Sequence, residues 1–265
     1  MTTCQIDCHL TYKIIQPTEI IFLIHAAYSP NQTILAEQLC ISPTAAWHEF
    51  QDPAHHNRHI RLRAAPCESF EVYYQATIEC HNIAMHPQSC GEVAIRDIPD
   101  AVLPYLLASR YCNSDQLENM AMRSFAWMEA GYARVKAIEQ WIFNNIAYIS
   151  GSSNQFTTAT DTLIQRAGVC RDFAHLGIAL CRALGIPARI VVGYVEIENF
   201  SPDFHAVFEA YLEGGWRLFD PTRLAPTENL IRIAAGVDAG DVAFATFYGD
   251  LELLKIEPRI NYQSE

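Results

Sequence analysis

The fold is decided by the stretch "RAGVCRDFAHLGIALCRALGIPAR", residues 166–189, in which a cysteine follows a glycine by two positions. Apolar residues recur in it at spacings of three and four, as on a helix packed against a core. This stripe consists of Cys170, Phe173, Ala174, Gly177, Leu180, Cys181 and Leu184. Gly185 and Pro187 stop the helix, and Gly168 ends a shorter helix expected over about 158–167. The pattern predicts a buried helix with Cys170 at its N-terminus.

The segments on either side of this helix predict a mixed helix and strand unit. Before it, apolar residues recur at helical spacing from residue 134 onward. These residues are Val135, Ile138, Trp141, Ile142 and Ile146. After it, "ARIVVGYVEI" (188–197) has the apolar run of a buried strand. "HAVFEAYLEGGWRLFDPT" (205–222) predicts two strands joined around Gly214 and Gly215.

The first part of the chain has a different pattern. Residues 3–14 alternate between apolar and polar side chains, which is typical of a strand with one buried face. The alternation returns in "FEVYYQATIECHNI" (70–83) and more weakly in 20–28 and 58–64. We expect residues 1–97 to form an antiparallel β domain, a sandwich, and residues 98–265 a second domain. The connection, 96–116, contains prolines. The predicted class is α+β.

Composition narrows the possible partners and compartments. Half of the 265 residues are hydrophobic and 18% are charged, which favours a globular protein with a packed core. The net charge of −12 repels phosphate backbones and anionic lipids, so neither nucleic acid nor a membrane is an expected partner. No apolar run approaches the ~20 residues of a membrane span, and the N-terminus lacks the features of a secretory signal. Nine cysteines without a disulfide-rich spacing fit reduced thiols. We therefore expect a cytoplasmic protein.

Cys170, His205 and Asp220 have the residue types of a thiol catalytic triad. A helix N-terminus favours the thiolate, because unpaired N–H groups point at the sulfur. A histidine completes the activation by taking the proton, and a carboxylate fixes the orientation of its ring. His205 starts one expected strand and Asp220 ends the next. The three residues are therefore candidates for one site.

The segments "GVCRDFAHLGIALCRALGIPAR" and "FHAVFEAYLEGGWRLFDPT" resemble the core of the transglutaminase-like superfamily. The resemblance covers about residues 134–226, with looser similarity from 109 to 243. It implies a papain-like core, in which the cysteine helix packs on an antiparallel sheet. It also implies that Cys170 is the nucleophile, that His205 is the general base and acid, and that Asp220 orients the imidazole.

The sequence departs from the calcium-dependent animal members of this superfamily. Those enzymes carry glutamine before the cysteine and tryptophan after it, whereas this chain has Val169 and Arg171. The chain is also too short for their additional β domains, so calcium activation is not implied. It is more similar to the smaller microbial branch with a β domain in front of the core, whose members are often described as cysteine proteases.

An acyl-transfer cysteine also needs hydrogen-bond donors for the developing oxyanion, and loss of one donor costs about 10²- to 10³-fold in rate. The backbone N–H of Cys170 is available at the helix start. By analogy with papain-like enzymes, Gln165 is the candidate for a second donor. His175 lies about 140° around the helix from Cys170, which predicts a supporting contact or packing rather than direct chemistry.

Other interpretations of these residues stay open. His205 as a buried structural histidine and Asp220 as the cap of the "DPT" turn are the alternatives to catalytic roles. "HHNRH" (55–59) contains three histidines but no companion ligands at regular spacing, which favours a solvated loop over a metal site. Four further cysteines lie on apolar faces and are expected to be structural. They are Cys4, Cys8, Cys80 and Cys181.

Strand register tests the assignment of Asp220. A two-residue turn at Gly214 and Gly215 would pair Asp220 with Glu209, which lies about 13 Å from His205 at ~3.3 Å per residue. Because Glu209 and His205 share one face of their strand, Asp220 would lie on the correct face of the sheet but too far along the strand from His205. We therefore predict a connection wider than two residues, or a bulge that shifts the pairing.

These observations favour a thiol acyl-transfer enzyme that acts on amide or peptide bonds through a thioester. We expect a protease or amidase, with transamidation as the alternative outcome of the same chemistry. A non-catalytic peptide-binding protein of this fold, and a metal site built from Cys170, His205 and Asp220, are the competing hypotheses. The acyl-transfer chemistry requires no metal or organic cofactor. The expected partner is a peptide, protein or other amide-containing substrate, and the sequence predicts no particular oligomeric state.

Overall fold

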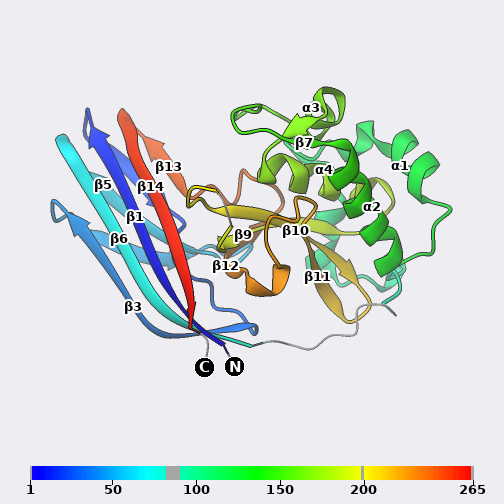
Figure 1. Cartoon of the computed structure of the whole chain (residues 1–265), viewed down its shortest axis with the longest axis horizontal. Helices are drawn as coiled ribbons and strands as arrows, with labels where there is room; N and C mark the ends of the chain where they lie inside the picture. Colours follow the sequence, from blue (N-terminus) through cyan, green and yellow to red (C-terminus); the bar gives the residue numbers. More distant parts are fainter. Residues whose placement is uncertain (1, 82–89, 198–199, 264–265) are drawn as a thin grey trace.

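The computed structural model describes residues 2–81, 90–197 and 200–263, and it places a β-sandwich beside a unit of helices and sheet (Figure 1). The sandwich contains two four-stranded antiparallel sheets, in the orders β14-β1-β6-β3 and β13-β2-β5-β4. Its strands are β1 (Thr2–Ile14), β2 (Thr18–Phe22), β3 (Gln32–Ser42), β4 (Trp47–Gln51), β5 (Arg58–Ala64), β6 (Cys67–Cys80), β13 (Ala245–Tyr248) and β14 (Leu251–Gln263). The predicted α+β class with an N-terminal all-β region is confirmed.

The alternation in the sequence determines which strand faces form the sandwich core. Every second side chain is buried in β1, from Cys4 to Ile14, and in β6, from Phe70 to Cys80. Because burial of one large aliphatic side chain contributes about 1.5–3 kcal/mol, a slip by one residue would be strongly unfavourable. Asn82 and Ile83, the last residues of the strand predicted over 70–83, lie outside the described residues.

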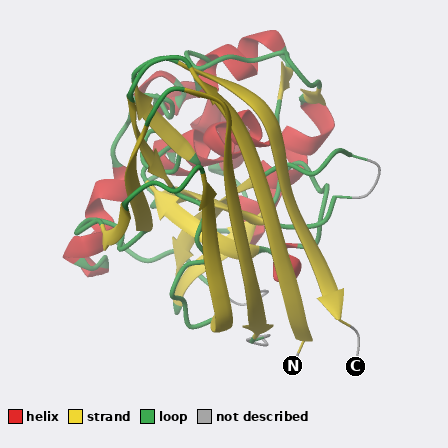
Figure 2. Cartoon of the chain, turned by 90° about the vertical axis from the view of Figure 1, so that its left-hand side faces the viewer, coloured by secondary structure: helices red, strands yellow, loops and turns green. Residues whose placement is uncertain are grey.

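The last two strands belong to the sandwich. β14 pairs with β1 along most of its length, and β13 pairs with β2, so the two ends of the chain lie side by side (Figures 1 and 2). The assignment of all of residues 98–265 to the second domain is therefore wrong for 245–263. Their strand signal is weak, because Leu253 and Leu254 are adjacent and both exposed, and Pro258 interrupts the pattern. Pro258 is tolerated because β14 is an edge strand.

The second unit contains a sheet of order β11-β10-β9-β12 and several helices, of which α4 packs on the sheet. Its strands are β7 (Ala147–Tyr148), β8 (Ala167–Gly168), β9 (Ala188–Tyr194), β10 (His205–Leu212), β11 (Gly215–Phe219) and β12 (Ile231–Gly236). Its helices are α1 (Glu118–Phe125), α2 (Tyr132–Asn145), α3 (Ala159–Gln165) and α4 (Cys170–Ala183), with 3₁₀ turns η2 (Ile95–Asp97), η3 (Asp100–Leu106), η4 (Ser114–Gln116) and η5 (Thr227–Asn229).

The cysteine helix α4 packs directly on this sheet. A Cβ added at Gly177 would lie 2.6 Å from the ring of Phe208 in β10, so only glycine permits this close approach. The predicted packing of the cysteine helix on an antiparallel sheet is confirmed.

Buried hydrogen bonds join the sandwich to the sheet of the second unit. The Tyr194 hydroxyl donates to the carbonyl of Ile24 at 2.6 Å. The side-chain amide of Asn57 donates to the carbonyl of Ala235 at 2.9 Å and accepts from its N–H at 3.0 Å. Because buried polar groups are costly to leave unpaired, these contacts fix the sandwich against β9 and β12.

None of the helices in residues 2–81, 90–197 and 200–263 is long and apolar enough to cross a membrane.

Candidate active site

Cys170 is the first residue of α4 and is half-buried. The helix begins here because the buried carboxylate of Asp172 accepts a hydrogen bond from the backbone N–H of Val169 at 2.9 Å. Arg171 pairs with Asp172 and donates to the carbonyl of Asn154 at 2.8 Å. These contacts tie the first turn of α4 to the preceding loop. They hold the sulfur at the end of the helix where the macrodipole favours a negative charge.

Tyr148 adds a phenol to the surroundings of Cys170. It lies in β7, which pairs in parallel with β8 so that Tyr148 is opposite Gly168. Its hydroxyl lies close to the backbone N–H and the thiol of Cys170. Burial and the charge of Cys170 raise the pKa of Tyr148, so its hydroxyl keeps its proton at neutral pH. Sequence reasoning missed this residue because a two-residue strand has no periodic pattern.

His205 and Asp220 meet where two neighbouring strands of the sheet end. His205 is the first residue of β10, and Asp220 directly follows the last residue of β11. Nε2 of His205 lies 2.8 Å from Oδ2 of Asp220, and both side chains are at most 3% exposed. The second carboxylate oxygen accepts from the N–H and the hydroxyl of Thr222 at 2.9 and 2.7 Å. Asp220 therefore caps the turn and holds the imidazole at the same time.

The hairpin that carries Asp220 has a tight turn, so the predicted wider connection is wrong. Leu212 pairs with Gly215, which leaves Glu213 and Gly214 as a two-residue turn. Gly214 and Gly215 both have positive φ, +77° and +119°, which only glycine adopts easily. The turn lies one residue earlier in the chain than a turn formed by the two glycines.

This earlier turn moves the register by two residues. Glu209 is opposite Leu218, and the same register carried one step past the ladder brings Asp220 level with Val207. Only two residues then separate this level from His205. A diagonal contact of this kind is within reach of long and aromatic side chains. The His205–Asp220 contact therefore forms without a bulge.

His205 carries the proton at neutral pH. Burial disfavours the charged ring, but the hydrogen bond to Asp220, the neighbouring Cys170 thiol and the negative charges of both residues outweigh burial and raise the pKa of His205 to about 10. Nδ1 of His205 forms no hydrogen bond within the described part of the chain. The ring is thus held at Nε2 and leaves Nδ1 to interact with the Cys170 thiol.

Cys170 and His205 line one cavity of about 490 Å³, within the range of ligand sites. Its polar residues besides these two are Tyr111, Gln155, Arg171 and Asp203. The apolar wall is formed by Leu23, Ile190, Val192, Phe204, Ala206, Ile233, Ala239, Val242, Ala243, Phe244 and Ala245. The cavity therefore combines a reactive polar end with an extended apolar surface.

The position of Gln165 does not support the oxyanion role predicted for it. Gln165 is the exposed last residue of α3 and is not among the described residues that line the cavity. Tyr148 is not among these lining residues either, but its hydroxyl lies close to Cys170, which makes it an alternative candidate for the donor.

His175 lies behind the cavity. Its Nε2 accepts a hydrogen bond from the N–H of Ala239 at 3.1 Å, and its ring stacks on Tyr111 with centroids 5.2 Å apart. Both partners line the cavity. Burial lowers the pKa of His175 to about 4, so this histidine is neutral at pH 7.

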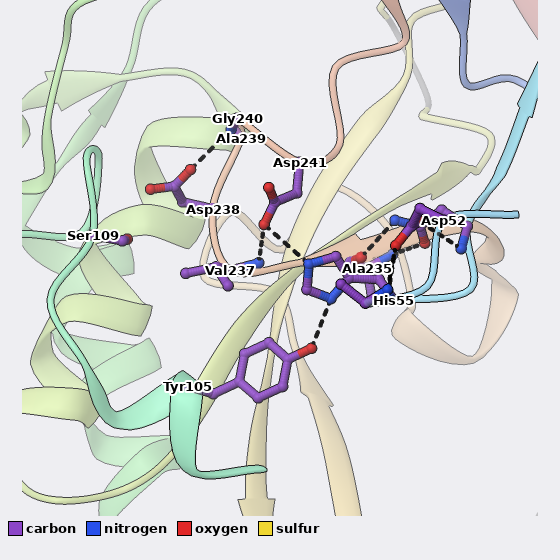
Figure 3. Close-up of polar contacts among 12 residues, drawn as sticks. Asp52, His55, Tyr105, Ser109, Ala235, Val237, Asp238, Ala239, Gly240 and Asp241 are labelled. Atoms are coloured by element: carbon purple, nitrogen blue, oxygen red, sulfur yellow. Dashed lines mark hydrogen bonds and ion pairs between the residues drawn. The ribbon is translucent and has the colours of Figure 1, made fainter. Parts of the chain in front are cut away.

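The histidine-rich segment 55–59 packs against the second unit, so its prediction as a solvated loop is wrong. Nδ1 of His55 is 2.9 Å from the Tyr105 hydroxyl, and Nε2 is 3.2 Å from Oδ2 of Asp241 (Figure 3). Asp241 also accepts from the N–H of Val237 at 2.8 Å. His55 therefore anchors the loop that leads to Val242 in the cavity wall. Within the described residues, no three His, Cys, Asp or Glu side chains are grouped to hold a metal ion.

Comparison with known proteins covers both units. A family model for the transglutaminase-like superfamily matches residues 118–221, and a model for the bacterial transglutaminase N-terminal domain matches residues 3–101. A solved structure from Cytophaga hutchinsonii, described as a "Putative Cysteine Protease", is 41% identical, with a TM-score of 0.93. The alignment covers 100% of this chain and 91% of that one.

Two uncharacterised mycobacterial proteins are similar over shorter regions. The Mycobacterium leprae protein is 37% identical over 120 residues, which are 41% of this chain and 42% of that protein. The Mycobacterium tuberculosis protein is 44% identical over 54 residues, 20% of this chain and 17% of that protein. The matches span less than half the length of either relative. Taken with the two family models and the full-length structural match, they establish that the chain belongs to the transglutaminase-like superfamily.

Proposed function

We propose that the protein is a thiol acyl-transfer enzyme that hydrolyses an amide or peptide bond through Cys170, His205 and Asp220. One observation carries the proposal: the 2.8 Å bond between His205 Nε2 and Asp220 leaves Nδ1 free beside the thiol with which it lines a cavity. A nucleophile, a base and a group that orients the base are the required elements of such a site.

The first step is attack on the carbonyl carbon. The imidazolium of His205 and the start of α4 both stabilise the thiolate of Cys170. The sulfur forms a bond to the carbonyl carbon, and the carbonyl oxygen becomes an oxyanion. The candidate donors that would stabilise it are the backbone N–H of Cys170 and the hydroxyl of Tyr148, which lies close to Cys170.

The second step expels the amine. His205 transfers its Nδ1 proton to the leaving nitrogen as the C–N bond breaks, and the acyl group stays on sulfur as a thioester. Water then attacks the thioester while His205 accepts a proton from it, and breaking of the C–S bond releases a carboxylic acid and restores the pair of Cys170 thiolate and His205 imidazolium. The polar residues Gln155, Arg171 and Asp203 near the reactive groups support access of water. An amine in place of water would give transamidation.

The proposed substrate is a peptide, a protein or another amide-containing molecule, and the proposed compartment is the cytoplasm. All nine cysteines have free thiols. This supports a reducing environment, because secreted proteins commonly pair their cysteines.

The proposal is tested by incubating a peptide library with wild type, Cys170→Ala and Cys40→Ala, with and without a primary amine, and reading the products by mass spectrometry. Cys40 is an exposed thiol and serves as the matched control. We expect cleavage by wild type and Cys40→Ala and none by Cys170→Ala. Amine-linked products without hydrolysis would favour the transglutaminase alternative.

Iodoacetamide separates the enzyme from a non-catalytic binding protein. We expect pH-dependent alkylation of Cys170 that is faster near neutrality than that of Cys40. A Cys170 thiol no more reactive than Cys40, together with no cleavage, would contradict the proposal. A stoichiometric metal that is lost in Cys170→Ala would favour the metal-site hypothesis instead.

A further inference from the structure

We infer that the cavity beside Cys170 is a side-chain pocket that selects an acyl donor with a large apolar side chain, and that the β-sandwich supplies part of its wall. The inference rests on the proposed acyl-transfer function. It adds the class of substrate and gives the sandwich a role in selecting it.

The sheet side of the pocket is apolar. Ile190 of β9, Ala206 of β10 and Ile233 of β12 line it from three neighbouring strands. A carboxylate or ammonium group placed against them would lose its hydration without gaining a partner. The charged residues that line the cavity, Arg171 and Asp203, are close in sequence to Cys170 and His205 and so belong to the reactive end. A charged donor side chain is therefore disfavoured in the rest of the pocket.

The opposite side comes from the sandwich and from the segment that returns to it. Leu23 follows β2 and is 1% exposed, and its N–H donates to the carbonyl of Phe244 at 2.9 Å. The ring of Phe244 stacks on that of Phe204 with centroids 5.1 Å apart. Phe204 directly precedes His205 in the chain. The sandwich is thus connected by direct contacts to the residue next to the proposed base.

The loop between β12 and β13 is held in place from two directions. His55 of the sandwich contacts Asp241 (Figure 3). On the other side, His175 of α4 accepts a hydrogen bond from the N–H of Ala239. Asp238 also accepts from the N–H of Tyr111 at 3.0 Å. These anchors fix the pocket wall formed by the loop. A pocket of fixed shape discriminates side chains by size as well as by polarity.

The inference is tested with N-acetyl-aminoacyl chloromethyl ketones that carry leucine, phenylalanine, alanine, glutamate or lysine side chains. Attack of the Cys170 sulfur forms a C–S bond and releases chloride, and intact-mass spectrometry gives its rate. Each rate is divided by the iodoacetamide rate of the same protein. We expect the leucine and phenylalanine probes to react at least about tenfold faster than the glutamate and lysine probes, with alanine between them.

Two variants test the wall. Leu23→Ala enlarges the pocket and should shift preference from leucine towards phenylalanine. Ala243→Leu, at an exposed position that lines the cavity, should reduce the advantage of both large probes without disturbing the core. Ala133→Leu, on the exposed side of α2, is the matched control and should leave the preference unchanged. Circular dichroism checks the fold of each, and if Leu23→Ala fails to fold, Ala243→Leu decides.

The outcomes separate this inference from the function on which it rests. A Cys170 thiol inert to iodoacetamide would contradict the acyl-transfer proposal itself. A reactive Cys170 with equal rates for all five ketones, or with faster reaction of a charged probe, would overturn only the apolar pocket. If Ala243→Leu kept the wild-type preference for the leucine and phenylalanine probes, the cavity would not be the source of that preference.

Discussion

His205 and His175 lie in two regions around α4, the reactive end and the buried flank. Their pKa values are shifted in opposite directions. Both side chains are at most 1% exposed. The pKa of His205 is raised to about 10, whereas that of His175 is lowered to about 4. Burial opposes the charged form at both. Only His205 has a carboxylate bonded directly to its ring, since the polar partner of His175 is the N–H of Ala239.

The comparison indicates that the groups around a buried ring, rather than burial alone, decide which of these two histidines keeps its proton; at His205 these groups are Asp220 and Cys170. A buried ring that accepts from a backbone N–H stays neutral and acts as a structural acceptor. The ring of His205, which is bonded to Asp220 and lies beside Cys170, stays cationic and can stabilise a neighbouring thiolate. Changes at the two histidines should therefore have different consequences.

The largest expected effect is on catalysis by His205→Gln. This variant removes the group that carries the proton in both steps, so kcat/KM should fall about 10²- to 10⁴-fold. His175→Gln is the matched control, because glutamine retains an acceptor for Ala239, and it should lose far less. Steady-state kinetics on one cleaved peptide gives both values. Equal losses in the two variants would contradict the distinction.

Tyr148→Phe should lower kcat about 10²- to 10³-fold, the usual cost of removing one oxyanion donor. The ring is retained, so the packing of Tyr148 on Phe173 should persist. Gln165→Ala should leave kcat unchanged, since Gln165 is exposed at the end of α3. Single-turnover kinetics distinguishes acylation from later steps. A larger effect at Gln165 than at Tyr148 would restore the original assignment of the donor.

Asp220→Asn should reduce activity at pH 7 about 10- to 100-fold, which corresponds to the loss of one hydrogen bond to a charged group. It should also move the alkaline limit of activity. The pKa of His205 is raised to about 10, so the wild-type imidazolium is lost only as the pH approaches that value. Without the carboxylate, the pKa of His205 should fall, and the alkaline limit of activity should shift to lower pH. A pH–rate profile in which the alkaline limit of Asp220→Asn equals that of wild type would show that Asp220 does not set the charge of His205.

The smallest effect on activity, but a measurable effect on stability, is expected from the pH dependence of His175. Its pKa is lowered, so the unfolded chain binds a proton first as the pH falls below its ordinary value. The resulting stability is present above about pH 6.5 and is lost as the pH falls towards about 4, on the order of 2–3 kcal/mol. His175→Gln cannot titrate and should lose less stability over this range. Urea unfolding at pH 7 and 4.5 measures the difference.

Much of the reactive end follows from local patterns in the sequence. Helical spacing located α4 and placed Cys170 at its start, and the order of residue types suggested His205 and Asp220. The register between β10 and β11 did not follow, because "EGG" at 213–215 permits a turn at either of two positions. One residue of difference in the turn moves the pairing by two. Only the packed hairpin selects between them.

Residues whose roles depend on distant contacts were not predictable from the pattern. Tyr148 reaches Cys170 through a two-residue strand, which is too short for any periodicity. β14 is an edge strand in which the adjacent residues Leu253 and Leu254 are both exposed. Its sequence therefore lacks the strict alternation of apolar and polar residues that would identify a strand. His55 was expected in solvent because its partners, Tyr105 and Asp241, lie far away in the sequence.

The return of β14 to β1 means that the helical unit is an insertion into the sandwich. Thr3 and Gln263 are paired although nearly the whole chain separates them, and such contacts form late because a long loop must close first. During synthesis on a ribosome, β1 gains its second neighbour only when the last strand emerges. Phe244 leads directly into β13, so the same final docking completes the wall beside Cys170. A nascent chain that lacks these strands therefore has neither a closed sandwich nor a finished cleft.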